Sequence, residues 1–151
     1  MAKTEPAVFT NMCMIYDGDR ILVQDRVDPD WPGVTFPGGH VEPGESFVRS
    51  VIREMKEETG LEIRDPKLCG IKQWVDNKEN YRYIVLFYKT DRFSGELKSS
   101  EEGEMKWIRL SELKNYHLAE SFDEMIKVFT DDSLSESYNY YVDDRWVCEN
   151  L

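Results

Sequence analysis

The residues with the clearest chemical pattern are three glutamates close together in one short segment. Glu57 and Glu58 are adjacent and lie three and four residues after Glu54. On a helix the three side chains would therefore share one side. Like charges at these spacings repel each other and weaken an isolated helix. Carboxylate oxygens suit hard divalent cations such as Mg²⁺ or Mn²⁺, which also accept phosphate oxygens as ligands. The spacing therefore predicts a metal site for a phosphoanhydride substrate.

A glycine-rich loop and a helix must position these acids. Gly38, Gly39 and Gly44 allow a tight turn and a close approach of the backbone to a ligand. The helix is predicted from about Ser46 to Thr59, and Gly60 would end it as a left-handed cap. One face should pack on a core, because apolar residues recur on it at helical spacing, namely Phe47, Val48, Val51, Ile52, Met55 and Thr59.

Residues 39–61 also contain a longer pattern with fixed offsets. It runs Gly, five residues, Glu, seven residues, Arg-Glu, an aliphatic position, any residue, Glu-Glu, any residue, Gly and an aliphatic residue. This pattern resembles the signature box of the Nudix hydrolases, with every defining position filled. Met55 stands where that family usually has Leu, Ile or Val, a change that conserves volume. An ordinary surface helix with a solvated acidic edge is the alternative, and the number of matching positions argues against it.

The resemblance implies roles for residues in and before this box. Glu54, Glu57 and Glu58 would bind Mg²⁺, for which Mn²⁺ could substitute, and Glu54 is also a candidate general base. The backbone carbonyl of Gly38 would add a ligand. Arg53 and Glu45 would form a supporting ion pair.

A second acidic loop lies ahead of a predicted strand. Glu102 is five residues before Trp107, and many Nudix hydrolases draw one more carboxylate from such a loop. Glu102 would be a metal ligand or the general base, Glu101 and Glu104 are alternatives, and a solvated turn is the other interpretation. The candidate metal ligands are thus Gly38, Glu54, Glu57, Glu58 and Glu102, and the candidate catalytic residues are Arg53, Glu54, Glu57, Glu58 and Glu102.

Residues outside the box bear on the substrate. The segment 21–26, followed by Phe36-Pro-Gly-Gly, looks like the MutT-type members that act on oxidised guanine nucleotides. In those members an arginine and a phenylalanine at these positions hold phosphate and base, although Phe36 could equally be a core residue and Arg26 a solvated strand end. No Asp or Asn matches their base reader in residues 115–120. The candidate substrate-binding residues are Arg26, Phe36, Gly39, His117 and Glu120.

The resemblance implies an enzyme that acts on a small nucleotide. We expect a Mg²⁺-dependent pyrophosphohydrolase that cleaves a nucleoside triphosphate, such as 8-oxo-dGTP, to the monophosphate and pyrophosphate. The first alternative is hydrolysis of another nucleoside diphosphate-X, such as ADP-ribose, a nucleotide sugar or a dinucleotide. The second is a non-enzymatic nucleotide sensor, which is disfavoured because such proteins usually have damaged boxes and an attached DNA-binding domain.

Composition limits the class of protein. The chain has 151 residues, a formal net charge of −11 and a pI near 4.7. This size suits one domain, over residues 1–151, and the acidity argues against a nucleic-acid polymer as partner. Three widely spaced cysteines form no disulfide framework, which fits a reducing cytoplasm. No apolar run has the length of a signal peptide or a membrane span, so a membrane partner is not expected.

Apolar alternation and turn residues predict the other elements. Strands are expected at 8–16 and 20–26 around an Asp-Gly-Asp turn, then at 68–75, 81–90 and 105–110. A second helix is expected within 119–129, after a short one at 111–114. This order predicts an α/β protein with a mixed β-sheet, which matches the Nudix-like α/β/α sandwich that the resemblance implies. The aromatic, acidic tail 131–151 is expected to dock on its own domain; a homodimer contact and a lid on the substrate are the alternatives.

Overall fold

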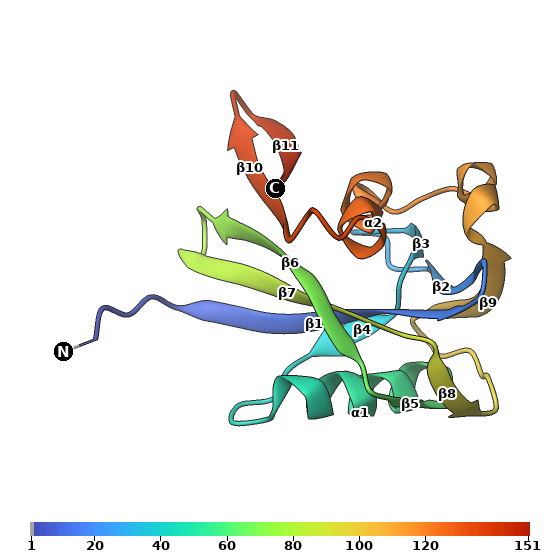
Figure 1. Cartoon of the computed structure of the whole chain (residues 1–151). Coiled ribbons are helices and arrows are strands. Elements are labelled where there is room, and N and C mark those ends of the chain that lie inside the picture. The colour runs from blue at the N-terminus through green and yellow to red at the C-terminus, as the bar shows by residue number, and fades with distance from the viewer. Residues whose placement is uncertain (1) are drawn as a thin grey trace.

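A mixed β-sheet runs through the molecule and separates its two main helices (Figure 1). The computed structural model describes residues 2–151. Within them the main strand order is β11 (Arg145–Asn150), β10 (Glu136–Val142), β6 (Lys67–Asp76), β7 (Tyr81–Thr90), β1 (Ala7–Asp17), β2 (Arg20–Arg26) and β3 (Gly33–Thr35).

Further strands join this sheet at its centre and at one end. β4 (Gly38–His40) pairs with β1, and β9 (Gly103–Arg109) pairs with β2. The pairs β1–β7 and β10–β6 are parallel, whereas the other pairs are antiparallel. The prediction of a mixed sheet is therefore confirmed. A separate two-stranded sheet, which the sequence did not predict, consists of β5 (Leu61–Arg64) and β8 (Arg92–Gly95).

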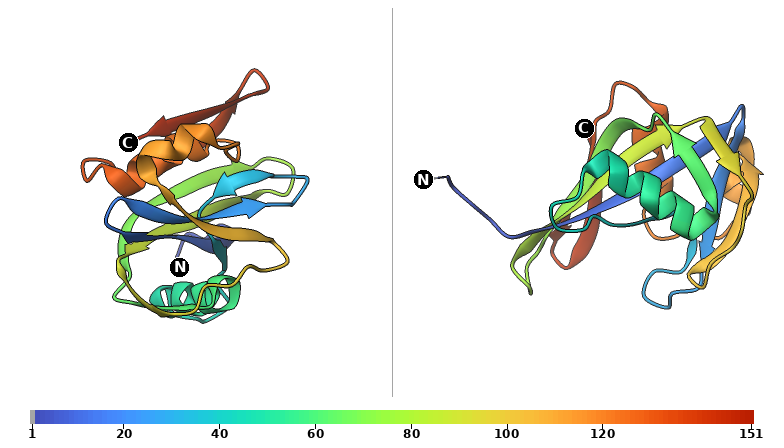
Figure 2. Two further views of the ribbon diagram at one scale, coloured as in Figure 1. Left: turned by 90° about the vertical axis from the view of Figure 1, so that its right-hand side faces the viewer. Right: turned by 90° about the horizontal axis from the view of Figure 1, so that it is seen from below.

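The helices cover opposite faces of the main sheet. Helix α1 (Phe47–Thr59) lies against one face and α2 (Phe122–Thr130) against the other, as two further views show (Figure 2). A short 3₁₀ helix, η1 (Leu110–Asn115), connects β9 to the segment before α2. In residues 2–151 no helix has the length and the apolar character needed to cross a membrane.

Helix α1 has the predicted ends but a shifted buried face. The Ser46 hydroxyl caps the first turn by accepting from the Arg49 amide at 3.3 Å, and Gly60 ends the helix with φ 80°. Phe47 and Val48 were predicted to be buried, yet each is 42% exposed. They lie in the first turn, where Ser50 takes the inward position instead and is completely buried. The apolar stripe therefore begins one turn later than the periodicity indicated.

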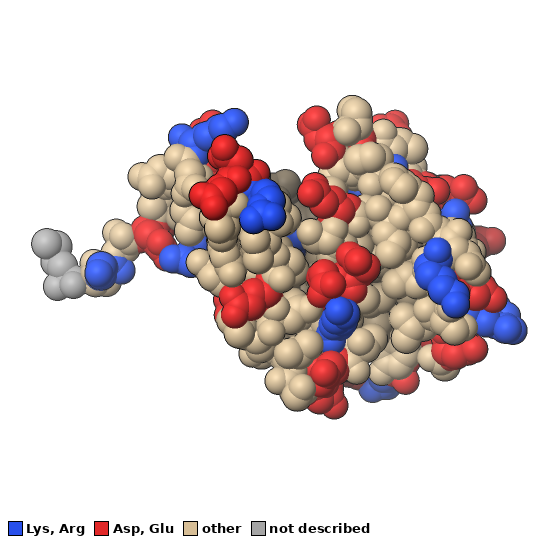
Figure 3. All heavy atoms as spheres, turned by 90° about the horizontal axis from the view of Figure 1, so that it is seen from above, with Lys and Arg blue, Asp and Glu red and all other residues tan. Residues whose placement is uncertain are grey.

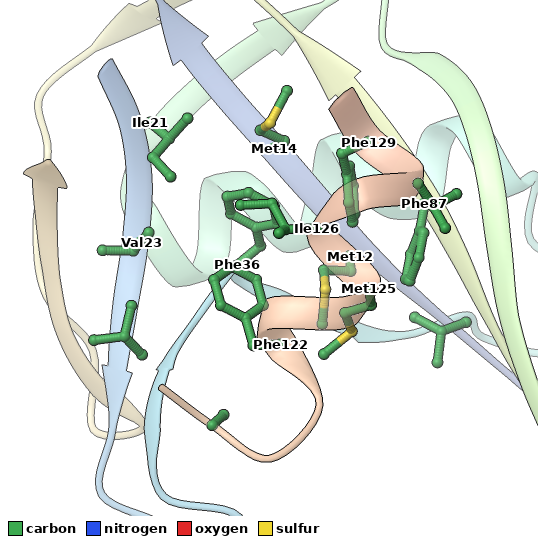
Figure 4. Close-up of a cluster of buried hydrophobic side chains, with 14 of the residues drawn as sticks. Met12, Met14, Ile21, Val23, Phe36, Phe87, Phe122, Met125, Ile126 and Phe129 are labelled. Carbon is green, nitrogen blue, oxygen red and sulfur yellow. The ribbon is translucent and has the colours of Figure 1, made fainter. Parts of the chain in front are cut away.

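Phe36 lies at the centre of the core between the sheet and α2 (Figure 4). Its ring is 2% exposed and meets Phe122 and Phe129 edge to face, with both centroid distances at 4.9 Å. A second core fills the space between the sheet and α1, where Val51 and Met55 are completely buried. The sheet therefore holds both helices through apolar packing, which fixes where each helix presents its polar side chains.

The segment after α2 forms a β-hairpin that extends the sheet. β10 runs parallel to β6, and β11 returns antiparallel to it. The turn residues Asp143 and Asp144 have φ of 49° and 64°, which suits a two-residue hairpin turn with the twist of the strands. Trp146 of β11 meets Trp74 of β6 edge to face at 6.0 Å between ring centroids. This hairpin supplies one side of the cleft described below.

We expect Phe36→Ala to lower the free energy of unfolding by about 3–5 kcal/mol, because it removes a fully buried ring and leaves a cavity. Phe9→Ala is the matched control, since Phe9 is 37% exposed, and it should cost about 1 kcal/mol or less. Urea unfolding of the three proteins gives both values. Equal losses for the two variants would contradict the central place of Phe36 in the core.

Candidate active site

A large cleft opens beside the sheet, with a volume of about 980 Å³. Its walls come from β6, β7, the C-terminal hairpin, the loop after β2 and the segment that leads into α2. Seen from above, this face of the molecule is hollowed and carries acidic side chains on both sides of the hollow (Figure 3). We call this space the main cleft; its polar lining includes Gly38, Gly39 and Glu102, and its aromatic lining includes Trp31, Trp74 and Tyr83. Its volume lies within the usual range of small-molecule sites.

Strand β4 brings the glycine-rich loop onto the carboxylate of Glu54. A side chain at position 39 would overlap the Glu54 carboxyl group. Glycine at this position therefore leaves room for the carboxyl group. Asn11 fixes both partners: its Oδ1 accepts from the Gly39 amide at 3.2 Å, and its Nδ2 donates to Ser50 Oγ at 3.0 Å. Strand β1 thereby ties the loop to the helix that carries the acids.

Arg53 connects this loop with the carboxylates of α1. Its guanidinium donates twice to Glu45, at 2.8 and 2.9 Å, and once to the carbonyl of His40 at 3.0 Å. Its Nη1 also donates to Glu54 Oε1 at 2.9 Å and to Glu57 Oε2 at 3.1 Å. The Arg53–Glu45 pair that the resemblance implies is thus part of a larger network. A fork with two parallel bonds gives this pair its fixed geometry.

Ser100 brings the second acidic loop to the end of α1. Its hydroxyl donates to Glu58 Oε2 at 2.9 Å and accepts from the Glu102 amide at 3.2 Å. The loop that contains Glu102 is thereby joined to the helix that contains Glu58. The sequence predicted an extra carboxylate from this loop, but it gave no sign that a serine would link the two segments.

The carboxyl groups influence one another's ionisation. Burial raises the pKa of Glu54 above its ordinary value; Arg53 opposes this shift, while Glu57 and Glu58 add to it. Partial desolvation raises the pKa of Glu102, the charges of Glu58 and Glu54 add to that shift, and Arg26 opposes it. These shifts indicate that carboxylates from α1 and from the second loop lie close enough to repel each other.

This donor set fits a divalent cation such as Mg²⁺. Carboxylate oxygens are hard ligands, and a cation among them would relieve the repulsion that adds to the burial effect on the two pKa values. In the arrangement of residues 2–151, no three His, Cys, Asp or Glu side chains already converge on one ion position. Arg53 holds one oxygen each of Glu54 and Glu57, so ligands for a metal ion would come from the remaining oxygens.

The predicted substrate-binding residues have different environments. Arg26, Phe36, Gly39 and Glu120 all line the main cleft. Phe36 does so as a core residue, and Arg26 Nε donates to the Trp31 carbonyl at 3.2 Å. His117 is not part of the cleft lining: its side chain is exposed, and its backbone carbonyl accepts from the Val34 amide at 2.8 Å. The structure therefore gives no support to a base contact by His117.

The sequence did not single out the aromatic wall of the cleft. Trp74 stacks on Tyr83 with 4.4 Å between ring centroids, and Trp31 Nε1 donates to the Glu120 carbonyl at 3.1 Å. Lys72 lies on the same strand face as Trp74, because alternate residues of β6 point to one side. The alternation of side chains along β6 was the one sequence signal that Lys72 and Trp74 share a side of the sheet. The partners across the cleft come from distant segments and could not be identified from it.

A family model of the NUDIX domain matches residues 8–129. The chain belongs to the Nudix family. It is 30% identical over 111 residues to an uncharacterized Nudix hydrolase, YvcI, of Bacillus subtilis, which covers 71% of this chain and 69% of that protein. It is 31% identical over 123 residues to an ADP-ribose pyrophosphatase of Methanocaldococcus jannaschii, covering 81% of this chain and 72% of that protein.

A solved structure extends the likeness to the fold. The crystal structure of a mutator MutT protein from Bacillus halodurans superposes with a TM-score of 0.76 at 26% identity, covering 94% of this chain and 97% of that one. The predicted Nudix fold, an α/β arrangement of helices on a mixed sheet, is confirmed. This Nudix protein is an enzyme that acts on pyrophosphate bonds of nucleotide derivatives. Nudix hydrolases in general use divalent metal ions for this chemistry.

We expect acid to weaken the Arg53–Glu45 pair in a defined pH window. Arg53 lowers the pKa of the Glu45 carboxyl from 4.5 to about 2. The stabilisation by the pair is therefore complete above about pH 4.5 and is lost as the pH falls through about 2. Thermal unfolding of the wild type and Glu45→Gln from pH 2.5 to 7 measures this: the wild type should be the more stable at neutral pH, and the difference should shrink toward pH 2.5.

Glu62→Gln is the control for this experiment. It removes an exposed ion pair to Lys56 at 3.4 Å and should change the unfolding temperature little, because such pairs contribute about 0–1 kcal/mol. A difference between the wild type and Glu45→Gln that stays constant down to pH 2.5 would contradict the assigned ion pair.

Proposed function

We propose that this Nudix protein is a Mg²⁺-dependent pyrophosphohydrolase that cleaves a nucleoside triphosphate to the monophosphate and pyrophosphate. Its preferred substrate is an oxidised purine deoxynucleotide such as 8-oxo-dGTP. The observation that carries this proposal is the composition of the main cleft, where Glu102 and the Gly38–Gly39 backbone line the same space as Trp31 and Phe36. Phosphates and a purine can therefore occupy one cavity. The likeness to the MutT structure supports the MutT-type resemblance from which this substrate class is inferred.

The residues around the phosphates have separate tasks in this proposal. Glu54, Glu57, Glu58 and Glu102 hold the metal ion, together with the carbonyl of Gly38. When bound, the ion supplies charge neutralisation on the phosphates and lowers the pKa of water. Arg53 is a positioning residue, because it fixes Glu54 through one carboxylate oxygen and leaves the other free.

Proton transfer belongs to a carboxylate of α1 or of the second acidic loop. Water forms a new O–P bond, the P–O bond to the leaving pyrophosphate breaks, and the water proton goes to a carboxylate oxygen. Glu54 and Glu102 are the two candidates, because the pKa of each is raised and a base works best with a pKa near the working pH. Arg26, at the cleft wall, contacts phosphate oxygens and limits the charge that the acids present to an anionic substrate.

A second candidate function is hydrolysis of ADP-ribose or another nucleoside diphosphate-X. The similarity to a protein named ADP-ribose pyrophosphatase favours it, and so does the width of the cleft, whose aromatic lining reaches Trp146 on the C-terminal hairpin. The two candidates share the acids and differ in the group beyond the second phosphate. A substrate panel therefore separates them.

We expect Glu54→Gln to lower kcat by about two to four orders of magnitude, because it removes a metal ligand or the general base. Folding should be preserved, since glutamine keeps the size of the side chain and can still accept from Arg53. The measurement is pyrophosphate release from 8-oxo-dGTP with Mg²⁺ for the wild type, Glu54→Gln and the exposed control Glu62→Gln. Near wild-type turnover of Glu54→Gln would remove Glu54 from the mechanism.

The same assay, extended to dNTPs, ADP-ribose and UDP-glucose, tests the substrate. Selective release of pyrophosphate from 8-oxo-dGTP, dependent on Glu54, supports the proposal. Release of AMP from ADP-ribose without pyrophosphate release from any triphosphate would replace it with the second candidate.

A further inference from the structure

Lys72 places a buried positive charge in the wall of the main cleft. The residue is 8% exposed and lines the cleft. Within residues 2–151 its ammonium group donates no hydrogen bond and lies in no ion pair. Two aromatic rings lie near this group: Nζ is 5.5 Å from the ring centroid of Trp74 and 6.0 Å from that of Trp31. Lysine is rarely buried without a partner, because an uncompensated charge costs free energy in the folded protein.

The fold places Lys72 in the interior of the sheet. Its strand lies inside the sheet, where Lys72 is in register with Val85 of β7 on one side and with Ser137 of β10 on the other. The two Trp rings face its ammonium group, which gives weak cation–π stabilisation. Burial lowers the pKa of Lys72, and the nearby Cys148 and Glu120 oppose that shift. Hydrogen-bond donors of Lys72 are therefore held at the cleft and are available to a ligand.

Lys72 and Glu120 have opposite hydrogen-bonding character. The lysine ammonium has three donors and no acceptor, whereas an ionised glutamate only accepts. Both residues line the main cleft, and the Glu120 charge acts on Lys72. A guanine-type base carries a carbonyl oxygen at position 6 and N–H donors at positions 1 and 2. Adenine has an amino group at position 6 and an acceptor at position 1, so it presents the reverse pattern to this pair.

We propose that Lys72 is a specificity-determining residue that donates to the 6-carbonyl oxygen of a guanine-type base, while Glu120 accepts from the N–H groups of the same edge. This inference rests on the proposed function for the position of the phosphates. The base ring packs against Trp31 or Trp74, which supplies stacking without base preference. Selection then comes from polar groups that would remain unpaired with adenine, and such mismatches discriminate strongly.

The test measures binding without a metal ion and without turnover. Titration with dGMP and with dAMP, followed by quenching of tryptophan fluorescence, gives the two dissociation constants. The wild type should bind dGMP more tightly. Lys72→Met keeps most of the side-chain volume and removes the donors, so it should weaken dGMP binding about 10- to 100-fold, because a hydrogen bond to a charged group contributes about 1.5–3 kcal/mol. Binding of dAMP should change by less than about threefold.

Lys106→Met is the matched control. Lys106 also lies over an aromatic ring, with Nζ 5.1 Å from the centroid of Tyr116, but it pairs with Asp25 at 3.6 Å and is absent from the cleft lining. Its loss should leave both dissociation constants unchanged. Urea unfolding checks that Lys72→Met folds, which we expect because replacing a buried charge by an apolar side chain is often neutral or stabilising. If that variant does not fold, Glu120→Gln, at an exposed position, should weaken dGMP binding alone.

The outcomes separate this inference from the proposed function. Equal weakening of dGMP and dAMP by Lys72→Met would mean that Lys72 binds the phosphate, which overturns base selection. No preference of the wild type for dGMP, or an unchanged preference in the variant, overturns it as well. Loss of the preference in Lys72→Met supports it, even if no triphosphate is hydrolysed, in which case the proposed function fails alone.

Discussion

The geometry of the active site depends on one guanidinium group. Arg53 holds Glu45 and His40 of the loop, and it also holds Glu54 and Glu57 of the helix that follows. A planar group with five donors can make these contacts at once, which lysine cannot do. The acids of α1 are therefore kept together by a fixed positive charge, and they remain close enough to repel each other. In the proposed mechanism, a divalent cation would relieve that residual repulsion.

Apolar packing on the two faces of the sheet holds the acids of α1 and the segment before α2 in position. The repulsion among Glu54, Glu57 and Glu58 would weaken α1 as an isolated helix, so its stability comes from the apolar side docked on the sheet. On the opposite face, α2 and Phe36 form the other core and bring Glu120 to the rim of the cleft. The sheet thus separates the acids of α1 from Glu120, and the cleft that Glu120 lines is reached from the α1 side by the Gly38–Gly39 backbone and Glu102.

The sequence predicted those features that depend on interactions between residues close together in the chain. Ser46 and Gly60 fix the ends of α1, and alternation with turn residues fixes the main strands, so these features followed from the sequence. The exposure of Phe47 and Val48 did not follow, because periodicity shows a face but not how far the sheet extends beneath it. The aromatic wall was missed for a related reason: only the topology brings Trp31 and Trp74 to the same cleft. His117 was selected by position alone, and the geometry leaves it outside the cleft.

The place of the C-terminal hairpin has a consequence for protein synthesis. Tyr141 and Trp146 belong to the strands that leave the ribosome after every other element of the sheet, and both line the cleft. Until they arrive, β6 presents an open edge to solvent, which invites pairing with other chains. A nascent or truncated chain therefore carries the complete acidic helix but lacks one wall of the cavity. The cleft gains this wall only after the hairpin has been synthesised.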